Sequence, residues 1–293
     1  PEMGNDASLE SIARDDIQHF YQSYFRPNQA SLIVVGDVTA AEIARQLESA
    51  LAEWQPGPAE PQKFPAPPAP APTGIILVDK PGAAQSVINV GLVGTLRNSP
   101  DHFSLSVMNT IFGGQFSSRL NMNLREEKGY TYGARSSFDW RLQPGPYIAS
   151  ASVQTSVTAP AIAEFLKEFR DIVGGRPVTE KELEFAKASI VRGFPAGFET
   201  SRDIAGRLDD LVEYGLPDNY FNSLVPNVSA VTAEDVMRVA KKYIDTNYLT
   251  IVIVGDRSKI EPGLRELPVG KRIRVGKFDE HFRLVPVEEG AGG

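Results

Sequence analysis

Cysteine is absent from the 293 residues, and histidine occurs only three times. Without cysteine there is no disulfide framework, no thiol nucleophile and no cysteine-ligated zinc site. None of the three histidines, His19, His102 and His281, has a second histidine three or four residues away. No helix can therefore present the histidine pair that binds catalytic zinc. We interpret all three as structural residues, with His19 on a helix surface and His102 capping the start of a helix.

Long apolar runs and an excess of basic charge are also missing. The longest apolar stretches, such as Leu32–Val35 and Leu249–Val254, are far shorter than the roughly eighteen residues of a membrane-spanning helix. The formal net charge is −7, and the basic residues form no cluster larger than Lys271-Arg272-Arg274. A nucleic-acid partner is not expected, because phosphate binding needs a clustered basic face.

Motifs of several enzyme classes are missing as well. The chain has no Gly-x-Ser-x-Gly elbow and no glycine loop for phosphate. The adjacent carboxylates Glu126-Glu127 and Asp209-Asp210 would point apart on a helix, as solvated residues do. A hydrolase that works with paired carboxylates and no metal therefore has no supporting residues.

What the sequence does contain is an internal repeat. Residues 14–37 match residues 233–256 without a gap, at an offset of 219 (255 − 36 = 219 for the paired glycines). Each copy indicates an amphipathic helix, a turn and a buried strand, Ser31–Asp37 in the first copy and Thr250–Asp256 in the second. A gapless match over about two dozen positions indicates a duplicated domain.

A Pro-rich stretch, residues 56–72, separates the copies and cannot form a helix or a central strand. We interpret it as a stiff linker; a recognition motif for a Pro-binding partner is the alternative. Residues 1–55 are predicted to be the C-terminal portion of a first domain, residues 73–269 a complete second domain, and residues 270–293 a tail. By the length of the second copy, roughly 150 residues of the first would lie upstream of Pro1.

The second domain is predicted to be α+β, a mixed or antiparallel sheet packed with helices. Alternating apolar residues predict strands, and apolar residues at helical spacing predict helices. The predicted strands are Gly74–Asp79, Ser86–Gly94, Thr131–Phe138, Tyr147–Thr155 and Leu249–Val254, with Arg272–Val275 as an added strand. The predicted helices are His102–Phe112, Gln115–Glu127, Ala161–Val173, Thr179–Val191, Thr200–Tyr214 and Thr232–Tyr243.

One segment of this domain, residues 112–133, combines several signals. Phe116, Leu120 and Leu124 form the apolar stripe of its predicted helix, and Gly129 is expected just beyond the end of that helix. The chain then enters a predicted strand at residues 130–132. Gly113-Gly114, before the helix, is interpreted as a tight turn between helices.

Two side chains of this segment are candidates for binding. Arg125 and Tyr132 are seven residues apart, so both could face one concavity where the helix gives way to the sheet. Arginine offers a fork for carboxylates or carbonyl oxygens, and tyrosine offers a phenolic hydrogen bond. A structural role, with Arg125 paired to a nearby acid, is the alternative from the residues alone.

The run Gly-Gly-x-Phe-Ser-Ser-Arg-Leu…Leu-Arg-Glu-x-x-Gly-x-x-Tyr resembles the C-terminal homologous domain of the insulinase/pitrilysin family of zinc metallopeptidases, and its processing-peptidase-like bacterial members fit best. The segment from Tyr24 to Asp37 is similar to the end of that family's first domain. The resemblance implies two related α+β domains that close around a chamber. It also implies an Arg and a Tyr, seven residues apart, that hold the substrate peptide and the tetrahedral intermediate, and these map onto Arg125 and Tyr132.

The family's His-x-x-Glu-His zinc motif does not occur in this chain, and the resemblance places it upstream of Pro1. We therefore expect no metal or cofactor in this chain and no activity of the chain alone, with zinc in the complete enzyme or in a partner. The chain is expected to be the substrate-binding, C-terminal part of a zinc-dependent endopeptidase acting on peptides. The alternative is a non-catalytic peptide-binding or scaffold subunit that partners a zinc-bearing homologue. A homo- or hetero-dimer is expected. The absence of cysteine and of an initiator Met favours the bacterial periplasm over the cytoplasm.

Overall fold

The computed structural model describes residues 4–58, 64–279 and 283–286. They belong to two units, and each is described by itself. The first unit comprises residues 1–66 and 193–218, and the second comprises residues 67–192 and 219–293. His281 and residues 287–293 of the predicted tail lie outside the described residues.

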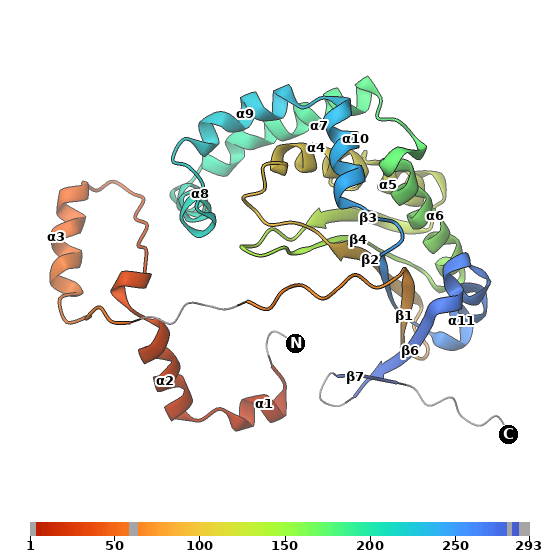
Figure 1. Cartoon of the computed structure of the whole chain (residues 1–293), viewed down its shortest axis with the longest axis horizontal. Coiled ribbons are helices and arrows are strands. Elements are labelled where there is room, and N and C mark those ends of the chain that lie inside the picture. Colours follow the sequence, from red (N-terminus) through yellow and green to blue (C-terminus); the bar gives the residue numbers. More distant parts are fainter. Residues whose placement is uncertain (1–3, 59–63, 280–282, 287–293) are drawn as a thin grey trace. The chain divides into compact units, whose positions relative to one another are not determined.

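The second unit contains a mixed seven-stranded sheet (Figure 1). Its strands are β1 (Gly74–Asp79), β2 (Gln85–Val93), β3 (Thr131–Phe138), β4 (Pro146–Gln154), β5 (Thr250–Gly255), β6 (Ile273–Phe278) and β7 (Leu284–Pro286). They are ordered β3-β4-β2-β5-β1-β6-β7, and β1 runs parallel to both β5 and β6. The other neighbours are antiparallel. A mixed sheet packed with helices confirms the predicted α+β class.

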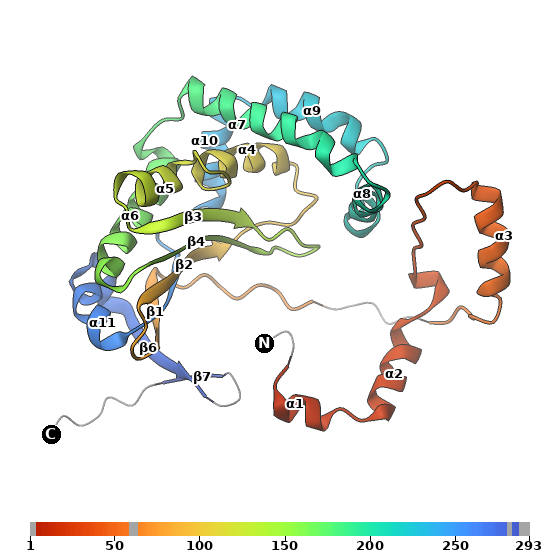
Figure 2. The ribbon, with the colours of Figure 1, turned by 180° about the vertical axis from the view of Figure 1, so that it is seen from behind.

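Helices cover one face of this sheet (Figures 1 and 2). They are α4 (His102–Phe112), α5 (Arg119–Asn121), η2 (Met122–Glu127), α6 (Thr158–Arg170), η4 (Asp171–Gly175), α7 (Glu180–Gly193), α9 (Tyr220–Ala230), α10 (Ala233–Tyr243) and α11 (Arg257–Glu266). Strand β2 shows the alternation that results: Ile88 and Val90 are fully buried, whereas Val87 beside them is 43% exposed. The opposite face of the sheet is therefore only partly covered by the described residues.

The predicted helix at Gln115–Glu127 was wrong at its start. The helix begins only at Arg119, and residues 115–118 form turns. Two helices, α9 and α11, were not predicted. Each contains a proline, Pro226 and Pro262 respectively, that interrupts the helical pattern in the sequence. The strand expected at Arg272–Val275 is present as β6, which begins one residue later, at Ile273.

The first unit contains α1 (Asp6–Ser11), α2 (Arg14–Tyr24), α3 (Ala40–Ala50) and α8 (Ser201–Tyr214). Helix α2 has the same bounds as α10 at the repeat offset (14 + 219 = 233 and 24 + 219 = 243). The strand predicted at Ser31–Asp37 was wrong, because residues 31–35 form no regular element. A strand needs a neighbour to pair its N–H and C=O groups, and the described part of this unit contains no other strand.

The two copies of the repeat differ sharply in burial. Ile17 and Leu32 are 62% and 63% exposed, and no residue of the described range 4–58 is buried. Their counterparts in the second unit, Val236 and Ile251, are 0% exposed. The same apolar pattern therefore packs into a core in one unit and remains uncovered in the other.

His102 lies in an aromatic cluster beside the sheet. Its ring centroid is 4.5 Å from that of Trp140 and 6.4 Å from that of Tyr220. Burial, with a smaller effect of the Arg97 guanidinium, lowers the pKa of His102 from 6.5 to about 3. The side chain packs as a neutral ring, so the interpretation of His102 as a helix cap is corrected to a packing role.

This lowered pKa predicts a pH-dependent stability. Below a pH of about 6.5 the unfolded chain takes up a proton at His102 that the folded chain does not bind. The free energy of unfolding should therefore fall by about 1 kcal/mol for each pH unit between about pH 6 and pH 5. Urea unfolding at several pH values measures this change in the free energy of unfolding, and His102→Gln should reduce the change. An equal pH dependence in the two proteins would show that His102 is not its cause.

Gly113 ends α4 directly against β3. The Ser136 N–H donates a hydrogen bond to the Gly113 carbonyl at 2.9 Å. A Cβ at position 113 would lie 2.7 Å from the Ser136 nitrogen and 2.9 Å from its Cβ. Only glycine therefore allows the helix end to approach the strand this closely.

Gly113→Ala should destabilise the protein by about 1–3 kcal/mol, the usual effect of overpacking. Gly133→Ala is the matched control, since the nearest atom to a Cβ added there would be the Asn121 Oδ1, at 3.9 Å. We expect the control to stay within about 0.5 kcal/mol of the wild type in urea unfolding. Similar losses in both variants would show that the contact with Ser136 is not the cause.

Candidate functional site

Arg125 lies on η2, a π-helical turn that continues α5. The Lys128 N–H donates to the Asn123 carbonyl at 2.9 Å, which closes the wide turn. Gly129 follows with φ +66°, which confirms the glycine predicted beyond the helix end. Such turns are rare in helices and occur frequently at functional sites.

Tyr132 lies on a bulge at the start of β3. The pairing of β3 with β4 shifts register between Thr131 and Ala134, so Tyr132 and Gly133 are outside the ladder. The Thr131 hydroxyl accepts the Gly133 N–H at 3.1 Å and stabilises the bulge. The Tyr132 side chain is 90% exposed. Bulges commonly redirect a side chain in this way.

The structure brings the two predicted residues together, because Arg125 and Tyr132 line one cavity of about 320 Å³. The Arg125 guanidinium lies 4.7 Å from the centre of the Phe116 ring, and its Nε is 3.1 Å from the Glu126 carboxylate. Arg125 therefore has an acidic neighbour and still contributes to the cavity wall. Phe116 was predicted in a buried stripe, but its side chain is 60% exposed and supports the arginine.

Asn121 joins the two sides of this cavity and was not predicted. Its amide NH₂ donates to the Phe116 carbonyl at 2.6 Å, and its Oδ1 accepts the Ala134 N–H at 3.0 Å. The side chain is nearly fully buried, at 3% exposure. Arg135, also not predicted, lines the same cavity. Only the position of Asn121 within residues 112–133 marked it in the sequence.

The outer edge of β3 is already occupied beyond Gly133. The N–H of Ala134 is bound by Asn121, and the N–H of Ser136 is bound by the Gly113 carbonyl. An incoming peptide cannot use these two donors to extend the sheet. At this edge of the sheet the Ala134 and Ser136 N–H groups are thus occupied, whereas Arg125 and Tyr132 line the cavity.

Arg119 attaches the segment that carries the site, residues 119–129, to helix α7. Its guanidinium, on a residue that is 4% exposed, bonds both oxygens of Glu182 at 2.7 and 2.8 Å and two backbone carbonyls. Burial alone would raise the pKa of Glu182, but hydrogen bonds from Arg119 and Thr179 outweigh it and lower the pKa to about 2. The pair is therefore ionised across the physiological range.

No group of three or more His, Cys, Asp or Glu side chains among the described residues is placed to hold a metal ion. The residues that line the Arg125–Tyr132 cavity include no His, Cys, Asp or Glu. A zinc site does not fit this part of the chain. In the part of the chain that the structure describes, no helix is both long and apolar enough to cross a membrane.

Comparison with known proteins gives consistent matches. A protein of Helicobacter pylori named "Non-peptidase homolog YmxG" is 24% identical over 88% of this chain and 59% of its own length. An "Uncharacterized zinc protease" of Mycobacterium tuberculosis is 26% identical over 94% of this chain and 62% of its own length. The chain thus spans about three-fifths of the length of these relatives.

Solved structures and a family model agree with these relatives. A crystal structure of a "peptidase M16 inactive domain" from Pseudomonas fluorescens superposes with a TM-score of 0.77 at 23% identity, over 85% of this chain and 59% of that chain. Residues 11–190 match the family model described as "Peptidase M16 inactive domain". That match covers more than half of the chain, which therefore belongs to the peptidase M16 family.

Proposed function

We propose that this chain is the zinc-free, peptide-binding part of an M16 protein that acts on peptides. Arg125 and Tyr132 hold the peptide in this proposal. The observation that carries it is that both residues line one cavity, where Tyr132 is 90% exposed. Both groups are donors, and peptide carbonyls are acceptors.

The chemistry of these two side chains suits a carbonyl that gains negative charge. A guanidinium and a phenolic O–H stabilise an oxyanion when they are already oriented before the reaction. Phe116 restrains Arg125 through the ring contact, and the bulge at Thr131–Ala134 sets the direction of Tyr132. Peptide hydrolysis would then require a metal-activated water from another part of the protein or from a partner.

The difference in burial between the two repeat copies supports the presence, in the complete protein, of a further segment that packs on the first copy. Ile17, Phe20 and Leu32 are more than half exposed, whereas the equivalent Val236, Val239 and Ile251 are fully buried. Large apolar patches of this kind usually mark an interface. We propose that an M16 segment bearing strands covers residues 14–36, either in the same polypeptide or in a partner subunit, and that this segment supplies the zinc.

A non-catalytic subunit is the second candidate. The relative from Helicobacter pylori favours it, since that protein is named a "Non-peptidase homolog". In this version the Arg125–Tyr132 cavity retains a peptide, and a zinc-bearing homologue performs any hydrolysis. The upstream coding sequence distinguishes the two, because a His-x-x-Glu-His motif there favours the catalytic version.

In the complete protein, Arg125→Ala or Tyr132→Phe should lower kcat/KM for an extended peptide by on the order of 10²-fold. The reason is the loss of one donor to the transition state. Steady-state hydrolysis of a quenched fluorescent peptide measures the effect. Lys181→Ala, an exposed cation on α7, is the matched control and should leave kcat/KM unchanged. Near-normal rates in both site variants would remove Arg125 and Tyr132 from the proposal.

The isolated 293-residue chain should not hydrolyse peptides, with or without added zinc. Adding a zinc-bearing M16 chain should restore hydrolysis if this chain is a subunit. Hydrogen exchange should then slow at residues 31–35, as they pair into a sheet. Zinc-dependent hydrolysis by the isolated chain would overturn the zinc-free assignment, and unchanged exchange would overturn the proposed covering of residues 14–36.

A further inference from the structure

The second unit contains a larger cavity that the proposed peptide site does not use. Its volume is about 790 Å³, in the range of pockets that enclose drug-sized ligands. It lies where β1 and β5 begin, between the end of α6 and the turn before β6. The lining residues are Pro72, Thr73, Ala163, Leu166, Arg170, Thr246, Asn247, Tyr248, Leu267, Pro268, Val269, Lys271 and Arg272.

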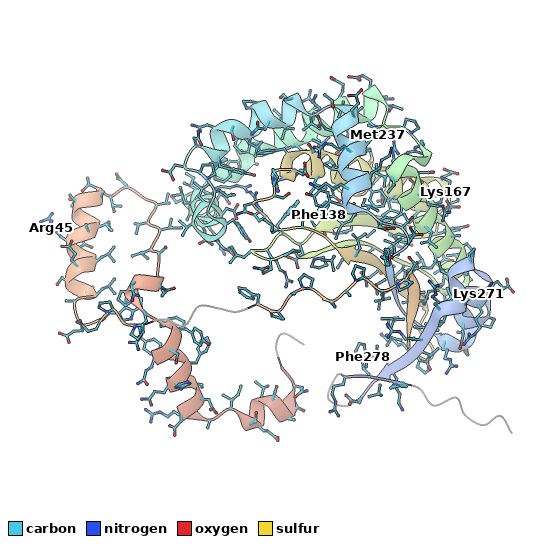
Figure 3. The ribbon with its side chains drawn as sticks, in the orientation of Figure 1. Arg45, Phe138, Lys167, Met237, Lys271 and Phe278 are labelled. Carbon is cyan, nitrogen blue, oxygen red and sulfur yellow. The ribbon has the colours of Figure 1, made fainter. Side chains whose placement is uncertain are left out.

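The charged side chains that line this cavity are all cations, which makes it a basic groove. Its lining includes the three cations Arg170, Lys271 and Arg272 and no Asp or Glu, although the chain as a whole carries a net charge of −7. No ion pair joins any of the three to a carboxylate among the described residues. Figure 3 labels Lys271, which lies just before β6.

Two acidic residues next to the groove lining in sequence, Asp171 and Asp245, bond other residues than the three cations. Glu266, before Leu267, is exposed and outside the lining. Asp171 follows Arg170 but bonds the ammonium of Lys167 at 3.2 Å. Asp245 precedes Thr246 and accepts both the N–H and the side-chain NH₂ of Asn247, at 2.9 and 2.8 Å. Neither Asp171 nor Asp245 therefore forms an ion pair with Arg170, Lys271 or Arg272.

The rest of the lining is mainly apolar. Leu166 is 9% exposed, Leu267 and Val269 are partly buried, and Tyr248 is 42% exposed. The Thr73 N–H is already bonded, since it donates to the Asn247 carbonyl at 2.7 Å. The three cations and the apolar side chains are therefore the main groups that the groove offers to a ligand.

We propose that this groove binds an acidic peptide segment of a partner protein, with carboxylates on Arg170, Lys271 and Arg272 and an apolar side chain against Leu166 and Leu267. Carboxylates match the fork of arginine and the ammonium of lysine. Apolar surface between the cations distinguishes such a peptide from a simple anion. The groove is independent of Arg125 and Tyr132, and its function does not depend on zinc.

The test uses the full chain and a fluorescein-labelled peptide of alternating glutamate and leucine. Anisotropy should show saturable binding that weakens as salt rises. The double variant Lys271→Glu/Arg272→Glu should bind on the order of 10-fold more weakly, because two attractions become repulsions. A peptide with serine in place of leucine should also bind several-fold more weakly.

The matched control is Arg274→Glu/Lys277→Glu, which makes the same change of net charge on exposed residues of β6 outside the groove lining. It should change the affinity less than about threefold, and thermal unfolding should confirm that both double variants fold. Equal losses in the two double variants would overturn the proposal. So would complete displacement by millimolar inorganic phosphate, or equal affinity for a single-stranded oligonucleotide.

Discussion

The candidate site depends on how the outer edge of β3 is closed. An edge strand presents free N–H groups, and here two of them are taken by the Asn121 amide and the Gly113 carbonyl. The same Asn121 holds the loop that carries Phe116. One buried side chain thus fixes the strand that bears Tyr132 relative to the aromatic ring that supports Arg125, and the end of α4 approaches the strand only because residue 113 is a glycine.

Much of the second unit could be predicted because its sequence pattern and its burial agree. Alternating residues such as Ile88 and Val90 identify the covered face of the sheet, and the helix His102–Phe112 has the predicted bounds. Helices α9 and α11 escaped prediction since Pro226 and Pro262 lie inside them. The sequence cannot show that neighbouring turns tolerate each proline, because that depends on tertiary packing.

The site itself was predicted in part. The spacing of Arg125 and Tyr132 pointed to one concavity, and both residues line one cavity. Phe116 was misplaced because an aromatic residue four positions before Leu120 matches a buried helical stripe equally well. The bonds of Asn121 join residues five and thirteen positions away, and no periodic pattern reports such contacts. The strand at Ser31–Asp37 failed for a related reason, since pairing partners decide a strand.

The π-helical turn at Met122–Glu127 has a consequence for the evolution of this segment. It amounts to one extra residue within a helix, and each added residue rotates the remainder of the helix by about 100° around its axis. The direction of the Arg125 side chain is therefore set by the number of residues between Arg119 and Gly129 as much as by the arginine itself. Deletion of one residue between Arg119 and Arg125 would keep the arginine and the tyrosine in the sequence and still turn the guanidinium away from Tyr132.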